Sequence, residues 1–194
     1  MKTRKPQSIP PLRIALLGFF AILLGCGSED APENSTAEGK RPEPPAVDIH
    51  AAVIGGNVDA IKQHIAAGSD LDLPDPFGGS SPLMSAAVFG QPEIASLLID
   101  AGVNINFTNR DGSTALHSAA FFCRPKIVDM LLENGADKTL RNNFGATAYE
   151  SVAGPFNEVK PFYDALSQQL GPLGLELNYD YLQATRPQIA AVLL

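Results

Sequence analysis

The feature that most constrains this chain is an internal repeat with a period of about 33 residues. Related apolar tetrapeptides begin at Ile49, Leu83 and Leu116. A glycine recurs at the same two steps, at positions 68, 102 and 135. Two landmarks with one spacing identify a repeat protein, in which each unit buries its apolar face against its neighbours.

Local signals predict two short helices in each repeat. A hydroxyl residue precedes the first helix of three units, where it can accept a hydrogen bond from a free backbone amide (Ser81, Thr114 and Thr147). The second helices carry apolar residues at three- and four-residue spacing, and a glycine follows each of them. The connectors between units are rich in Asn, Asp, Gly and Pro, which predicts tight turns at residues 76–79, 109–112 and 142–145.

These motifs resemble those of the ankyrin repeat family. The family's T-P-L-H core appears as Ser81-Pro82-Leu83-Met84 and as Thr114-Ala115-Leu116-His117. The tetratricopeptide repeat has a similar length, but it has aromatic landmarks and no turn-rich connector, so it fits less well. The resemblance implies an all-α solenoid of about four helix–turn–helix units with β-turn or hairpin connectors. We expect these units at residues 47–74, 75–107, 108–140 and 141–169.

The ends of the repeat region depart from the pattern. The last unit degenerates after Tyr149, and it contains Gly154-Pro155 and Pro161 where a helix is expected. The tail, residues 170–194, lies outside the pattern, and we expect it to cap the last unit. Within it, Thr185-Arg186-Pro187-Gln188 predicts a capping box that opens a short helix to Leu194. The alternative is that the tail folds across the concave groove of the stack and occupies it.

The amino-terminal segment predicts export and lipidation. Residues 1–25 contain four basic residues and no acidic one, and the uncharged run 14–24 is too short to span a bilayer but suits a signal peptide. Leu23-Leu24-Gly25-Cys26 resembles the lipobox of bacterial lipoproteins, which implies a lipid anchor on Cys26. The alternative is an ordinary secretory signal that leaves Cys26 as a free thiol. Residues 26–46 are polar and rich in Pro, Glu and Ser, which predicts a disordered linker.

Composition and motifs narrow the possible functions. The chain has a formal charge of -7, and leaving out the basic segment 1–25 changes the balance to ten basic against 21 acidic side chains, or -11. Such an acidic body repels phosphates, so we expect no nucleic-acid partner. We find no metal-ligand spacing, cofactor fingerprint or nucleophile motif, so we expect no metal, no cofactor and no catalysis. The family resemblance gives His50 and His117 structural roles, and Cys123 has no local base to activate it.

The resemblance also indicates where a partner would bind. In the ankyrin family, the turn tips and the exposed ends of the inner helices contact partners. Those positions hold five of the ten Phe residues, and exposed aromatic groups often anchor interfaces. The predicted partner-binding residues are Phe77, Val88, Phe89, Arg110, Asp111, Phe121, Phe122, Asn143 and Phe144. The alternative for Phe89, Phe121 and Phe122 is that they pack between inner helices as core.

Two functions follow from these expectations. The first is a membrane-tethered module that binds and organises or regulates another protein of the bacterial cell envelope. Gly27 after the lipobox cysteine favours the outer membrane, facing the periplasm. The second is an envelope enzyme or small-ligand binder, with a pocket between the repeats and the tail. The candidates for the polar groups of this pocket are three neighbouring residues of the tail, Tyr179, Asp180 and Tyr181.

Overall fold

The computed structural model describes residues 41–194, which form one compact unit. The predicted signal peptide, Cys26 and the linker up to residue 40 lie outside the described residues. The described part of the chain is helical and contains no strand. Its elements are α1 (Ile49–Ile54), α2 (Val58–Ala67), α3 (Pro82–Phe89), α4 (Pro92–Asp100), α5 (Ala115–Phe121), α6 (Pro125–Glu133), α7 (Glu150–Ala153), α8 (Phe156–Leu170), the 3-10 helix η1 (Gly171–Leu173) and α9 (Tyr179–Leu193).

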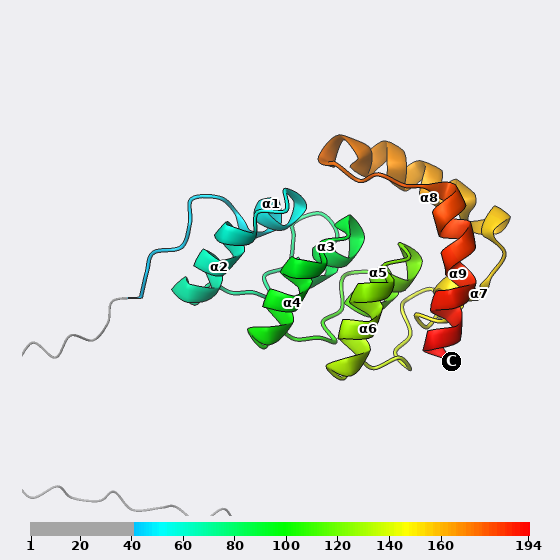
Figure 1. Cartoon of the computed structure of the whole chain (residues 1–194), viewed down its shortest axis with the longest axis horizontal. Helices are drawn as coiled ribbons and strands as arrows, with labels where there is room; N and C mark the ends of the chain where they lie inside the picture. The colour runs from blue at the N-terminus through cyan, green and yellow to red at the C-terminus, as the bar shows by residue number, and fades with distance from the viewer. Residues whose placement is uncertain (1–40) are drawn as a thin grey trace, which may run out of the picture. The chain divides into compact units, whose positions relative to one another are not determined.

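The helices stack in two rows, as the repeat predicts. Helices α1, α3, α5 and α7 form an inner row in which each packs on the next, and α2, α4 and α6 form an outer row. Each of α1, α3 and α5 also packs on the helix that follows it (Figure 1). The all-helical repeat fold is therefore confirmed.

The predicted caps form. The hydroxyl of Ser81 accepts a hydrogen bond from the Met84 amide, and Thr114 and His117 make a reciprocal capping box. Proline occupies the first turn of α3, α4 and α6, where its missing amide costs nothing. The glycines that end the outer helices have positive φ, at +70° for Gly68 and +84° for Gly135, which a residue with a Cβ adopts only under strain.

The core lies between the two rows. Leu83 and Leu116 of the inner helices and Leu98 and Leu131 of the outer helices are fully buried. Burial of one such side chain stabilises the fold by about 1.5–3 kcal/mol. Alanine pairs on the inner helices, such as Ala119-Ala120, are also fully buried, which allows the inner helices to approach closely.

The last unit differs from the expected helix pair. Its capping box forms, because Glu150 accepts from the Thr147 amide while the Thr147 hydroxyl accepts from the Glu150 amide. Helix α7 nevertheless lasts only four residues, and α8 does not continue the outer row. Figure 1 shows α8 on the far side of α5 from α6. The expected unit 141–169 therefore supplies an inner helix but no regular outer helix.

Helix α9 takes the place beside the last inner helix. It packs on α7 and on α5, which is where a cap of the last unit would lie. The prediction that this helix begins at Thr185 is wrong. It begins at Tyr179, because the Asn178 side chain caps it by accepting the Tyr181 amide, and it continues through Pro187. Pro187 is exposed, so water can reach the carbonyl that its missing amide leaves free.

Candidate functional site

The turn tips share one local structure. Each connector begins with an Asp or Asn whose side-chain oxygen accepts the amide of the residue two positions on, at 2.7–3.1 Å. The residues placed in this way are Phe77, Asp111 and Phe144. Burial alone would raise the pKa of Asp75, which opens the first turn, but its bonds from the amides of Gly78, Ser80 and Phe77 together lower that pKa.

Neighbouring tips are joined to one another. The Arg110 amide donates to the Gly78 carbonyl at 3.0 Å, and the Asn143 amide donates to the Asp111 carbonyl at 2.8 Å. Side chains add to these bonds, because Arg110 Nη1 donates to the Phe77 carbonyl at 2.6 Å and Asn143 Nδ2 donates to the Arg110 carbonyl at 2.9 Å. The three tips therefore form one continuous surface rather than three independent loops.

This surface presents exposed aromatic rings. Phe77 is 90% exposed and Phe144 is 80% exposed, and Arg110, Asp111 and Asn143 between them are exposed as well. A hollow of about 440 Å³ lies beside the first two turns, with Pro74, Pro76, Phe107 and Arg110 among its lining residues. We call the exposed residues Phe77, Arg110, Asp111, Asn143 and Phe144 the tip surface. An exposed apolar group beside a hollow is typical of a contact site.

The inner-helix half of the predicted stripe is not a continuation of the tip surface. Phe122 is only 6% exposed, so the expectation that it is exposed is wrong. Phe121 is half-buried, because the Tyr163 ring from α8 covers it at a centroid distance of 4.5 Å. Val88 and Phe89 are half-buried. The carboxy-terminal helices therefore cover the end of α5. The alternative interpretation expected these rings to be buried, but between inner helices and not under α8 and α9.

The three histidines are structural. His117 holds Thr114 through Nδ1, and its Nε2 lies 3.0 Å from the Ala146 carbonyl of the next turn. His50 makes the equivalent bond to the Leu73 carbonyl at 2.8 Å, while Met84 fills this position in the second repeat without a polar group. Nε2 of His64 bonds to the Val47 carbonyl. These side chains tie each helix to a neighbouring segment.

Cys123 is not an activated nucleophile. It is fully buried, and burial raises the pKa of its thiol to about 11, although Arg186 and Arg124 oppose that shift. The thiol is therefore protonated at neutral pH. Its φ of +52° is left-handed, at a position where Gly56 and Gly90 stand in the earlier repeats. Two residues of α9 contact it. The Cys123 thiol donates to the Leu182 carbonyl at 3.8 Å, and the Tyr181 hydroxyl donates to the Cys123 carbonyl at 3.3 Å.

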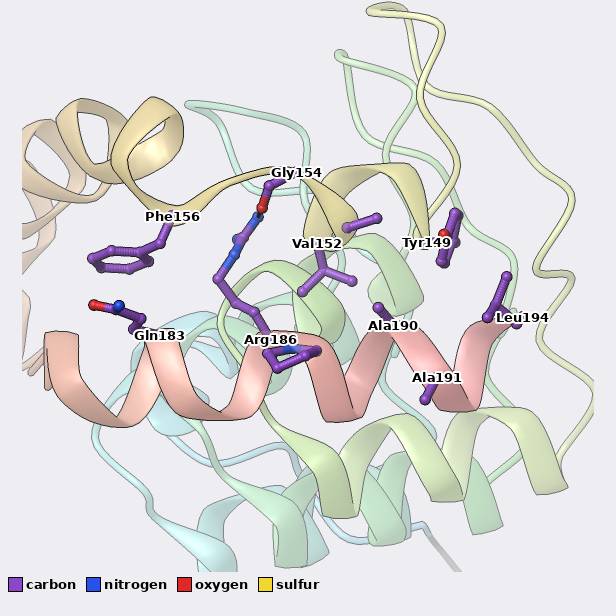
Figure 2. A pocket seen from close by; sticks show the side chains of 11 residues that line it. Tyr149, Val152, Gly154, Phe156, Gln183, Arg186, Ala190, Ala191 and Leu194 are labelled. Carbon is purple, nitrogen blue, oxygen red and sulfur yellow. Dashed lines mark hydrogen bonds between the residues drawn. The ribbon is translucent and has the colours of Figure 1, made fainter.

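A second hollow lies between α7, the link from α7 to α8, and α9, which is the place between the repeats and the tail where the alternative function expected a pocket. Its volume is about 400 Å³, and Figure 2 shows the side chains that line it. Arg186 lines it and is only 3% exposed. The sequence gives one weak signal for this site, which is a single arginine in the otherwise largely apolar segment 182–194. Of the predicted tail residues Tyr179, Asp180 and Tyr181, none lines this hollow.

Within residues 41–194, no group of three or more His, Cys, Asp or Glu side chains is arranged to hold a metal ion. Across the same range, every helix is too short or too polar to cross a bilayer.

Comparison with known proteins agrees with the fold. Residues 49–142 match the family model described as ankyrin repeats (3 copies). Among curated proteins, the human protein phosphatase 1 regulatory subunit 27 is 38% identical over 64 residues, which are 33% of this chain and 41% of that protein. Among solved structures, the ankyrin repeat domain of Bcl-3, a unique member of the IkappaB protein family, is 31% identical. It has a TM-score of 0.51, over 53% of this chain and 45% of that one. The chain thus spans less than half the length of each protein, and its residues 49–142 match the ankyrin repeat model and fold as a stack of helix pairs.

Proposed function

We propose that this chain is a non-catalytic module that binds another protein through the tip surface and thereby organises or regulates it. The single observation that carries this proposal is the exposure of Phe77 and Phe144 on turns that are hydrogen-bonded to one another. Aromatic groups held on a rigid frame lose little conformational entropy on binding, so they can act as anchors. The human relative is a regulatory subunit of protein phosphatase 1, which is a role exerted on another protein and is consistent with this proposal.

The charge of the chain indicates the chemistry of the partner. Beyond residue 25 the formal charge is -11, while the tip surface itself carries one Arg and one Asp. Complementary charge speeds association and excludes wrong partners. We therefore expect the partner to present an apolar patch that accepts the two rings, surrounded by basic side chains.

We further propose that a lipid on Cys26 tethers the module to a membrane of the bacterial cell envelope, the outer membrane facing the periplasm. This proposal depends on the sequence alone, through the lipobox-like Leu23-Leu24-Gly25-Cys26 and the signal-peptide pattern before it. Two or three acyl chains anchor firmly, since each buried methylene contributes about 0.8 kcal/mol. The linker that follows would let the repeats reach a partner away from the bilayer.

The tether and the binding surface are tested separately. A Cys26→Ser chain should lose the mass of the acyl groups and its membrane retention; an unchanged mass and an unchanged membrane fraction would reject the lipid anchor. For the surface, the full chain and its Phe77→Ser, Phe144→Ser double variant are compared as baits in envelope extract, with folding checked by circular dichroism.

The chain offers a matched control for the surface experiment. Phe162 on α8 is 64% exposed but lies outside the tip surface, so Phe162→Ser removes an exposed ring elsewhere. The proposal predicts that the double variant is folded and loses the partner, while Phe162→Ser retains it. Equal loss in both, or retention in both, would contradict binding through the tip surface.

A further inference from the structure

The hollow beside α9 contains a buried positive charge. It lies on the carboxy-terminal helices and shares no lining residue with the tip surface. Most of its walls are apolar, and Val152, Phe156 and Ala190 are among them, while Tyr149, Gln183 and Arg186 supply polar groups. Figure 2 shows the Arg186 side chain rising from α9 through the middle of this group of residues towards Gly154.

Arg186 uses only part of its hydrogen-bonding capacity. Nη1 donates to the Tyr163 hydroxyl at 2.9 Å, and Nη2 donates to the Gly154 carbonyl at 3.2 Å. Its Nε is buried and has no hydrogen-bond partner within residues 41–194. A guanidinium group carries five N–H donors and is always charged in proteins. The bonds to Tyr163 and Gly154 therefore leave Nε–H and further N–H groups without an acceptor.

The charge of Arg186 also lacks a counter-ion. No carboxylate in residues 41–194 forms an ion pair with it, and no Asp or Glu lines the hollow. Two acidic groups lie near enough to sense the charge, but neither is ionised at neutral pH. Burial raises the pKa of Tyr163 to about 12, and burial raises that of Cys123 to about 11. A buried charge without a counter-ion is costly, and a bound anion relieves that cost.

We propose that this hollow binds a small organic carboxylate with an apolar body. The carboxylate would accept from the N–H groups of Arg186 that the bonds to Tyr163 and Gly154 leave free, since a guanidinium group matches the two oxygens of a carboxylate. The apolar body would lie on Val152, Phe156 and Ala190. A volume of about 400 Å³ suits a small molecule. A phosphate fits less well, because Arg186 is the one cationic residue among those lining the hollow and the remaining walls are largely apolar.

Benzoate and its neutral counterpart benzamide test the proposal, because they share a shape and differ in charge. The full chain is titrated with each by calorimetry, and the arginine Nε–H resonances are followed by NMR. We expect saturable binding of benzoate at millimolar concentrations or below, weaker binding of benzamide, and a shift of the Arg186 resonance with benzoate. The proposal would be overturned if benzoate and benzamide bound equally well, or if inorganic phosphate bound as tightly as benzoate. The absence of saturable benzoate binding at millimolar concentrations would also overturn it.

Three variants locate the site. Arg186→Met should weaken benzoate binding about tenfold or more, as loss of a charge-assisted pair does. Arg124→Met is the matched control, because Arg124 also has a buried Nε without a partner but does not line the hollow, so binding should be unchanged. Ala190→Phe fills the hollow while leaving Arg186 in place, and it should abolish binding even if Arg186→Met does not fold. Full benzoate affinity in a folded Arg186→Met or Ala190→Phe chain would place the ligand elsewhere and overturn the proposal.

This site is independent of the proposed partner surface. The Phe77→Ser, Phe144→Ser double variant should bind benzoate with unchanged affinity, since neither ring lines the hollow. A failure of benzoate binding therefore leaves the tip-surface proposal intact, and loss of partner binding in the double variant leaves the carboxylate site intact.

Discussion

The repeats and the carboxy-terminal helices solve the same packing problem in different ways. In the repeats, each inner helix is covered by the next, and the same caps, turns and glycines recur in successive units. At the end of the stack no further repeat follows in the described chain, and α9 covers α7 and the end of α5 instead. The repeats depend on many equivalent local interactions, whereas the end depends on a few specific ones: Tyr163, Tyr181 and Arg186 each bond to a backbone carbonyl or to one another.

The largest effect should come from removing the covering helix. A chain that ends at Asn178 loses Leu182, Ile189 and Leu193, all buried against the stack. Losing a single buried Leu or Ile side chain costs about 2–5 kcal/mol, so losing all three should lower the melting temperature sharply. Hydrogen exchange should show loss of protection in α5 to α7 first and continued protection in α1 to α4, because repeats are stabilised by their nearest neighbours. Unchanged stability with stronger partner binding would instead favour a tail that occupies the groove.

A smaller effect is expected from one hydroxyl at the end of the stack. The Tyr163 hydroxyl donates to the Phe121 carbonyl at 2.5 Å and accepts from Arg186 at 2.9 Å. Tyr163→Phe leaves both groups without this partner, which should cost about 1–3 kcal/mol in chemical denaturation. Tyr181→Phe is the matched control, because that side chain is 45% exposed and water can replace its bond to Cys123. Equal costs for the two changes would contradict a special role for Tyr163.

The sequence was sufficient to predict the helix pairs of the repeats, but it was insufficient to predict how the carboxy-terminal helices pack on the last of them. Turn residues, N-caps and glycines act on their own neighbourhood, so the helix pairs could be predicted from their spacing. The family resemblance, carried over to these positions, predicted that Phe77 and Phe144 are exposed on the turn tips. The burial of Phe122 and the partial burial of Phe121 could not be predicted, because that end of α5 is covered by α8 and α9, which lie far along the chain from it. The start of α9 was misplaced because Thr185 and Asn178 both offer a capping side chain, and packing selects Asn178, leaving Thr185 buried inside the helix. Arg186 is buried for the same reason, because the packing of α9 on the stack places it inside the helix next to Thr185.

Replacing a glycine of the repeats by alanine should destabilise the chain by an amount that depends on what surrounds that glycine. Gly90 and Gly135 both have positive φ, so alanine at either position is strained by about 1–2 kcal/mol. A Cβ on Gly90 would also lie 2.8 Å from Cζ of Arg124, whereas a Cβ on Gly135 would meet nothing within 4 Å. Gly90→Ala should therefore destabilise the chain more than Gly135→Ala, since Arg124 would have to leave its bond to the Val88 carbonyl. Equal urea midpoints for the two variants would contradict this difference.

The smallest effect concerns pH and the histidine of the third repeat. Burial lowers the pKa of His117 below 6.5, although its bond to the Ala146 carbonyl opposes this shift. The unfolded chain therefore binds more protons than the folded chain between the folded pKa and 6.5, so the free energy of unfolding should fall as pH decreases through that window. His117→Met, which copies the second repeat, removes this contribution. Denaturation curves of parent and variant with the same pH slope would contradict the assignment.

The most direct test of the central claim is to map where the partner touches the repeats. A photo-crosslinking amino acid is placed at Phe77, at Phe144, or at the exposed Lys62 on the outer helix α2, in cells that produce the full chain. If the tip surface binds the partner, Phe77 and Phe144 should each give the same crosslinked product and Lys62 should give none. A product that forms from Lys62 and not from the two tips would contradict the account.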